Sequence, residues 1–142
     1  MLVGFAYFDT SAFVKLYDQR EDDAEGISSI VYKYRAVSSV LLYPEVISAL
    51  NRKRREDGFA EGGFELTVAT FKRDYDLVYK VQLSQIVLEL TEKLLYKYPL
   101  RALDGIHLSS ALSFKDIIND KIQFFSADEK LLNASRAEGL VL

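Results

Sequence analysis

The chain has no cysteine, which excludes disulfide bonds, thiolate metal ligands and a cysteine nucleophile. It also has no apolar run that approaches the roughly 18 residues of a membrane-spanning helix. Its N-terminus lacks the basic segment, apolar stretch and small-residue cleavage site of a secretory signal. We therefore expect a protein of the cytoplasm that does not enter a membrane.

A large excess of charge of either sign is also missing, because the formal net charge is −3. This balance argues against a protein that coats nucleic acid through its overall charge. It does not exclude a nucleic-acid enzyme, since an acidic metal site and a local basic patch can occur in one chain. The length of 142 residues and the hydrophobic share of 49% favour a single globular domain, 1–142, with a substantial core.

Short apolar runs alternate along the chain with segments of helical periodicity. The short runs predict strands at 3–8, 36–38, 77–81, 122–126 and 140–142. The periodic segments predict helices at 12–17, 18–34, 64–75, 84–98, 104–114 and 127–137, and one more that begins between 39 and 44 and ends near 57–58. Short strands separated by helices are typical of an α/β fold, in which a parallel sheet is covered by helices on both faces.

Four acidic residues stand where these predicted elements begin or end. Asp9 and Asp128 follow strands, and Glu45 and Asp104 lie at the starts of helices. Ligands of open parallel sheets bind beyond the carboxyl ends of the strands. Carboxylates beside buried strands also require compensation of their charge. If the fold gathers all four, a divalent cation would supply it, so metal-assisted chemistry on phosphates is the leading hypothesis.

Helix capping is the simpler explanation for the two aspartates that follow strands, because aspartate is a favoured N-cap. The segment Ser126-Ala127-Asp128-Glu129 matches a capping box with Ser126 as the cap. Asp128 would then be free to point elsewhere. Thr10 or Ser11 could likewise cap the first helix in place of Asp9.

The two acids at helix starts have structural explanations of their own. Glu45 has small or apolar residues three and four positions away and no cation among them, although a helix start favours an exposed glutamate. Asp104 could simply cap its helix. His107, the only histidine, follows Asp104 by one turn on roughly the same face. We interpret His107 as a residue that hydrogen-bonds locally rather than as a ligand or a base.

A run of four cations, Arg52, Lys53, Arg54 and Arg55, lies near the C-terminus of a predicted helix. The helix dipole favours cations there, so a solvated helix end explains the run. Contact with a phosphate backbone is the alternative.

Four segments, taken in order, resemble the PIN domain, the nuclease fold of VapC-type toxins in toxin–antitoxin modules. They are residues 8–16, 43–50, 100–112 and 125–132, and each holds one of the four acids. The departures are Gly105, where alanine is commoner in the family, and Ser126, where threonine is commoner. The resemblance covers nearly the whole chain. It implies a three-layer α/β/α fold with a mostly parallel central sheet of four to five strands.

Such a resemblance implies a metal-dependent endoribonuclease that hydrolyses RNA phosphodiester bonds, using Mg²⁺ or Mn²⁺ held by carboxylate oxygens. Asp9 and Asp104 would be direct metal ligands, and Glu45 and Asp128 would complete the site. Without metal, crowded carboxylates would raise one another's pKa values. Ser11 and Ser126 would hydrogen-bond the carboxylates or waters.

The expected partners are the RNA substrate, a small antitoxin and a second copy of the chain. Lys15, Arg101 and the run 52–55 are the candidate phosphate contacts. One alternative is a PIN-like binding or assembly module without robust nuclease activity. Another is an aspartyl phosphatase, which would need a second aspartate at the position of Ser11.

Overall fold

The computed structural model describes residues 4–17 and 33–142, and these contain four strands and six helices. The strands are β1 (Gly4–Phe8), β2 (Tyr34–Ser39), β3 (Tyr79–Val81) and β4 (Gln123–Phe125). The helices are α1 (Thr10–Lys15), α2 (Leu42–Arg55), α3 (Gly63–Tyr75), α4 (Gln85–Lys97), α5 (Ala102–Ile118) and α6 (Glu129–Ala137). No helix in these ranges is long and apolar enough to cross a lipid bilayer.

The four strands form one sheet in the order β3-β2-β1-β4, and every pair is parallel. Tyr7 of β1 lies between Val37 and Phe124 at the centre of this sheet. The predicted strand at 140–142 is wrong, because only Val141 makes a bridge, to Gln123. Gly139 turns the chain immediately before it with a φ of +90°. The chain therefore meets the sheet edge for one residue only.

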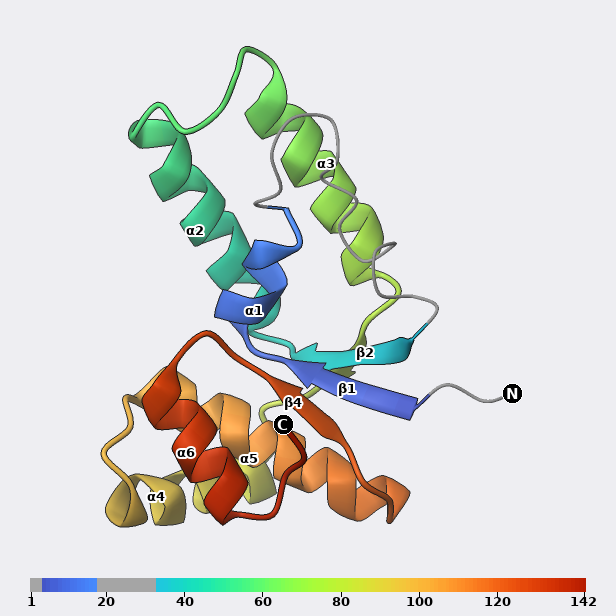
Figure 1. Ribbon diagram of the computed structural model, residues 1–142, viewed down its shortest axis with the longest axis vertical. Helices are drawn as coiled ribbons and strands as arrows, with labels where there is room; N and C mark the ends of the chain where they lie inside the picture. The colour runs from blue at the N-terminus through green and yellow to red at the C-terminus, as the bar shows by residue number, and fades with distance from the viewer. Residues whose placement is uncertain (1–3, 18–32) are drawn as a thin grey trace.

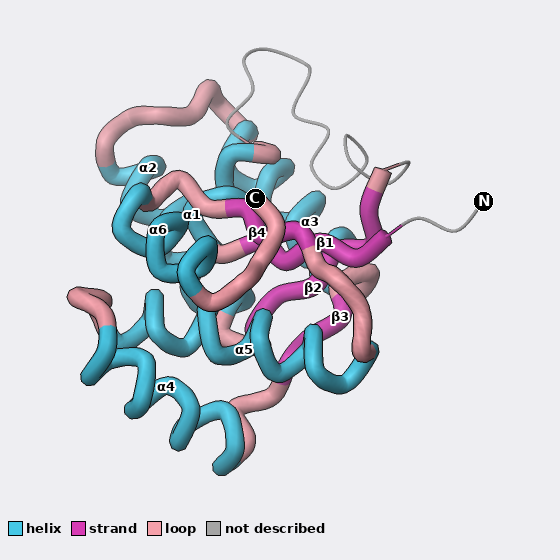
Figure 2. The backbone as a smooth tube through the Cα atoms, turned by 60° about the horizontal axis from the view of Figure 1, so that its bottom comes forward, coloured by secondary structure: helices cyan, strands magenta, loops and turns pink. Residues whose placement is uncertain are grey.

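Helices cover both faces of the sheet, with α1, α2 and α3 on one side and α4, α5 and α6 on the other (Figure 1; Figure 2). The side chains of β1 alternate between the two layers, as expected of a strand buried on both faces. Ala6 and Phe8 pack with Phe13 in one core, whereas Tyr7 packs with Leu108 in the other. This arrangement confirms the predicted α/β fold with a four-stranded parallel sheet.

Most predicted elements are present with small changes at their ends. One prediction that the described residues cover only in part is the helix at 18–34. Residues 18–32 lie outside the described ranges, and Tyr34, which that helix was expected to include, is the first residue of β2. Two strands end at the same edge of the sheet, where Phe8 leads into α1 and Phe125 leads toward α6. The backbone N–H of Asp9 donates to the Phe125 carbonyl at 3.1 Å, which joins the two ends.

Candidate active site

Asp9 is the most enclosed of the four acids, with 3% of its surface exposed. It is the N-cap of α1, and its Oδ1 accepts hydrogen bonds from the Ala12 N–H at 2.8 Å and the Ser11 hydroxyl at 2.7 Å. Its Oδ2 accepts from the Ser126 hydroxyl at 2.5 Å. The idea that Thr10 or Ser11 caps this helix is therefore wrong, since both already lie within its first turn.

The two serines tie the start of α1 to the loop before α6. Besides donating to Asp9, the Ser126 hydroxyl accepts from the Asp128 N–H at 3.0 Å. The Ser11 hydroxyl accepts from the Ala127 N–H at 2.9 Å. Both hydroxyls therefore contact the Asp9 carboxylate and fix the loop that carries Asp128.

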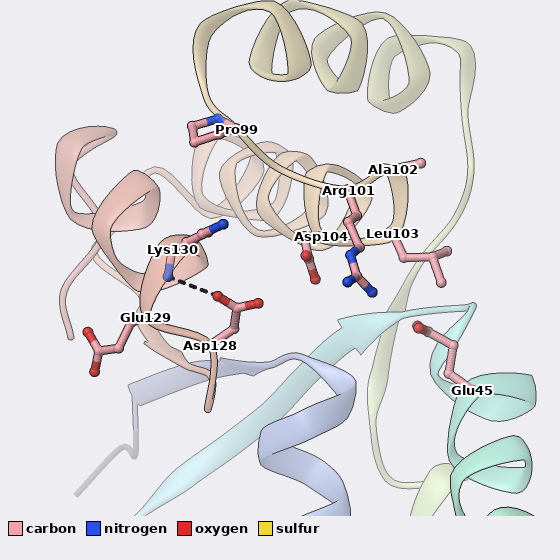
Figure 3. A pocket seen from close by; sticks show the side chains of 9 residues that line it. All are labelled: Glu45, Pro99, Arg101, Ala102, Leu103, Asp104, Asp128, Glu129 and Lys130. Atoms are coloured by element: carbon pink, nitrogen blue, oxygen red, sulfur yellow. Dashed lines mark hydrogen bonds between the residues drawn. The ribbon is translucent and has the colours of Figure 1, made fainter.

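Asp128 caps α6, contrary to the capping-box interpretation. Its Oδ1 accepts from the N–H groups of Lys130 at 2.8 Å and Leu131 at 3.2 Å. The helix begins at Glu129, so Ser126 stands too far ahead of it to act as the cap. The second carboxylate oxygen of Asp128 points toward Asp104 across an open space (Figure 3). Capping thus occupies one oxygen and leaves the other available.

Asp104 lies in the first turn of α5, which begins two residues earlier than predicted, so Asp104 is not a cap. Its carboxylate makes no hydrogen bond to any residue that the structure describes. Burial raises the pKa of Asp104, and the negative charges of Asp128 and Asp9 raise it further, against the opposing effect of His107 and Arg101. The expected repulsion between neighbouring carboxylates therefore contributes to the raised pKa of Asp104.

Glu45, in the first turn of α2, finds its partners in other elements. Its Oε1 accepts from the Thr10 hydroxyl at 2.8 Å and lies 2.9 Å from Nε2 of His107. Burial alone would raise the pKa of Glu45, but the hydrogen bond and charge of His107 and the bond from Thr10 outweigh it and lower the pKa. The interpretation of His107 as a locally bonded residue is wrong, because its partners come from β1, α1 and α2.

Three of the four acids, Glu45, Asp104 and Asp128, line an open cleft of about 730 Å³ at the carboxyl edge of the sheet (Figure 3). Asp9 is not among the residues that line it. The Arg101 side chain points into it between Asp104 and Glu45, and Lys130 borders it from α6. Sequence reasoning included Arg101 as a phosphate contact but missed Lys130. The residues that line the cleft are Glu45, Pro99, Arg101, Ala102, Leu103, Asp104, Asp128, Glu129 and Lys130.

The other predicted phosphate contacts lie away from this cleft. The cations of the run 52–55 occupy the last turn of α2, at the opposite end of that helix from Glu45 (Figure 1). Lys53 and Arg54 lie over the rings of Phe59 and Phe64, at 4.7 and 4.3 Å from the ring centres. Lys15 is exposed on α1 and does not border the cleft. Their role in RNA binding stays a prediction.

The chemistry of these side chains suits a metal ion, but their present spacing does not bring three of them together around one ion. Carboxylate oxygens suit Mg²⁺ and Mn²⁺. Asp104 makes no hydrogen bond to the described residues and Asp128 commits only one oxygen, so both can serve as ligands. Across residues 4–17 and 33–142, however, no group of three or more histidine, aspartate or glutamate side chains is close enough to hold an ion. At the present spacing, a bound ion would therefore take at most two of these side chains as direct ligands, with water at its other positions.

The sequence pattern of the PIN domain family matches residues 6–137. The chain belongs to the PIN domain family. This PIN domain is 33% identical over 116 residues to Ribonuclease VapC45 of Mycobacterium tuberculosis strain CDC 1551 / Oshkosh. It has the same identity to Ribonuclease VapC49 of strain ATCC 25618 / H37Rv. Each alignment covers 78% of this chain and 76% of the relative.

A solved structure shares the fold of this PIN domain. It is described as a toxin–antitoxin complex from Klebsiella pneumoniae, with a TM-score of 0.62 and 17% sequence identity. The match covers 88% of each chain. The likeness confirms the arrangement of sheet and helices over most of the chain.

Proposed function

We propose that this PIN domain is a metal-dependent endoribonuclease that acts as the toxin of a type II toxin–antitoxin pair in the cytoplasm. The observation that carries the proposal is the open cleft in which Asp104 and Asp128 face each other, bordered by Glu45 and two cations. The alignments with the two relatives, which are named ribonucleases, cover most of the chain. The class of reaction is the hydrolysis of RNA phosphodiester bonds.

The four acids, Asp9, Glu45, Asp104 and Asp128, would hold Mg²⁺ or Mn²⁺. When bound, the ion supplies an activated water and neutralises negative charge on the phosphate. Asp104 contributes a carboxylate that its acidic neighbours destabilise, so a cation at this position removes the repulsion. Asp9 accepts three hydrogen bonds, which leaves about one of its four lone-pair directions free.

The cations of the cleft would orient the RNA. Arg101 can bind a phosphate through two parallel N–H groups, and Lys130 offers a mobile point charge on the other side. Ser11 and Ser126 keep the Asp9 carboxylate in place through their hydroxyl groups.

A small antitoxin and a second copy of the chain are the proposed protein partners. Support for the antitoxin is the related fold in a toxin–antitoxin complex. Support for a dimer is the exposed apolar surface of α4, where Ile86 and Tyr96 are 74% and 81% exposed. Size-exclusion chromatography with light scattering, with and without the candidate antitoxin, tests both.

The second candidate is a PIN-like binding or assembly module without robust nuclease activity. The wide spacing of the acids, which places no three within reach of one ion among the described residues, favours this alternative. It predicts a protein that binds a partner tightly yet neither binds Mn²⁺ nor cuts RNA.

The deciding experiment measures RNA cleavage and, separately, Mn²⁺ binding by calorimetry. Asp104→Asn should abolish both. The matched control is Asp116→Asn, which removes an exposed carboxylate from the same helix and should leave both unchanged. If wild-type protein shows neither Mn²⁺ binding nor cleavage, the nuclease proposal fails. If Asp104→Asn keeps both, the assignment of the site fails.

A further inference from the structure

A buried chain of hydrogen bonds runs from the centre of the sheet to the edge of the cleft. The Tyr7 hydroxyl of β1 lies 2.7 Å from Nδ1 of His107 on α5. Nε2 of the same ring lies 2.9 Å from Oε1 of Glu45 on α2. Tyr7 is fully buried and His107 is 3% exposed. The chain therefore connects a residue in the middle of the sheet with one that lines the cleft.

The chemistry of the three groups sets the direction of each hydrogen bond. A carboxylate can only accept, so Nε2 of His107 must carry the hydrogen that is donated to Glu45. When the His107 imidazole is neutral it has only this one N–H, which leaves Nδ1 as an acceptor for the Tyr7 hydroxyl. The phenol of Tyr7 carries a hydrogen that it can donate to this nitrogen, which lies 2.7 Å away. Tyr7 thus selects the ring form of His107 that can donate to Glu45.

The effect of this selection falls on one oxygen of Glu45. Oε1 is held by both His107 and Thr10. A glutamate has three rotatable side-chain bonds, and contacts from two different helices remove most of that freedom. The Glu45 side chain is only 20% exposed, so its orientation is fixed by protein rather than by water. Its second oxygen, Oε2, is left for the cleft.

We propose that Tyr7 and His107 are positioning residues, which hold Glu45 in a fixed orientation through the chain Tyr7 O–H to Nδ1 and Nε2–H to Oε1. The role rests on the function proposed above, in which Glu45 helps to hold the metal ion. Neither residue touches substrate or metal. Groups that orient a metal ligand from behind raise metal affinity or activity by about 10- to 100-fold.

The ring form of His107 can be read directly, because it is the only histidine in the chain. We would label protein without an affinity tag with ¹⁵N and record long-range ¹H–¹⁵N correlations of the imidazole. The wild type should show hydrogen on Nε2 and none on Nδ1. Tyr7→Phe removes the donor to Nδ1 and should give a mixture of the two ring forms. A wild-type ring with hydrogen on Nδ1 alone, or a Tyr7→Phe spectrum unchanged from wild type, overturns the proposal.

The matched control for Tyr7→Phe is Tyr17→Phe. It also deletes a buried phenol that donates a hydrogen bond, to Asp74 at 2.6 Å, but it lies outside the chain to Glu45. Tyr7→Phe should lower Mn²⁺ affinity, and kcat for RNA with little change in KM, by about tenfold or more. Tyr17→Phe should change stability without this effect. Equal effects of the two substitutions would show a structural role only and overturn the proposal.

Two substitutions of His107 distinguish the contributions of its two ring nitrogens. Gln places an amide N–H near the position of Nε2, whereas Ala removes both contacts. His107→Gln should therefore retain more Mn²⁺ affinity than His107→Ala, and a folded His107→Ala with wild-type affinity would overturn the proposal. If wild-type protein itself fails to bind Mn²⁺ or cut RNA, the proposed function and the positioning role both fail. The ring form in the wild type and in Tyr7→Phe still reports separately on the hydrogen-bond chain.

Discussion

Asp9 has a structural role and a proposed metal role, and two substitutions of this residue separate them. Asp9→Asn keeps an oxygen for the Ser11 hydroxyl and the Ala12 N–H, and its amide can donate to Ser126. Asp9→Ala removes all three hydrogen bonds. Both remove the buried negative charge equally. The difference in unfolding free energy between the two variants therefore isolates the hydrogen bonds.

The expected difference follows from those three contacts. Loss of the helix cap costs about 1 kcal/mol. The loss of the hydrogen bond between residue 9 and each of the two serines costs about 1 kcal/mol more. Asp9→Ala should therefore be about 3 kcal/mol less stable than Asp9→Asn, which for a chain of this size is a melting temperature lower by about 10 °C.

Urea and thermal unfolding, followed by circular dichroism in the presence of a chelator, measure this difference without contribution from metal. Both variants should be inactive on RNA. Equal unfolding midpoints for Asp9→Ala and Asp9→Asn would refute the reasoning, because the three hydrogen bonds would then contribute nothing. Cleavage by Asp9→Asn would remove Asp9 from the metal site but would leave the stability argument intact.

Three further predictions test the cleft. In metal-free protein, Asp104→Asn should raise the melting temperature at pH 7. Folding raises the pKa of Asp104, so the ionised carboxylate destabilises the fold above that pKa. The difference in melting temperature between the variant and the wild type should vanish in acid, below the pKa of Asp104 in the unfolded chain. Arg101→Ala and Lys130→Ala should each raise KM for RNA and reduce the salt dependence of binding by about one unit of slope, as titrations at several salt concentrations would show. Lys72→Ala, which removes an exposed cation of α3 away from the cleft, should do neither. Ser126→Ala should weaken Mn²⁺ binding and cost about 1–2 kcal/mol in urea unfolding, and Ser126→Thr, which keeps the hydroxyl, should not.

The elements of the fold could be predicted from the sequence because each carries its own local pattern. Burial on both faces makes β1 continuously apolar, and the alternation of its side chains between two cores needs no long-range information. The first and last residues of the elements are harder to predict from local pattern. The helix α5 begins at Ala102 rather than at Asp104 as predicted, because the conformation of the extended residue before a helix depends on its neighbours in space.

The partners of Glu45 and His107 could not be predicted for a different reason. These two residues are 62 positions apart, and only the packing of α5 and α2 at the same sheet edge brings them together. A glutamate without a local cation indicated that some partner was needed. Which residue supplies it depends on how the crossovers place the helices, and a single sequence contains no direct record of that.

From the sequence alone, capping and metal binding are competing explanations for Asp9 and Asp128, but in the structure the two are compatible. An N-cap uses lone pairs of one carboxylate oxygen, and a carboxylate has about four such directions. Asp128 caps α6 with Oδ1 while its other oxygen points toward Asp104. The cap fixes the carboxylate relative to a rigid helix, so less ordering is required when an ion binds. Helix capping therefore prepares these acids for the proposed site.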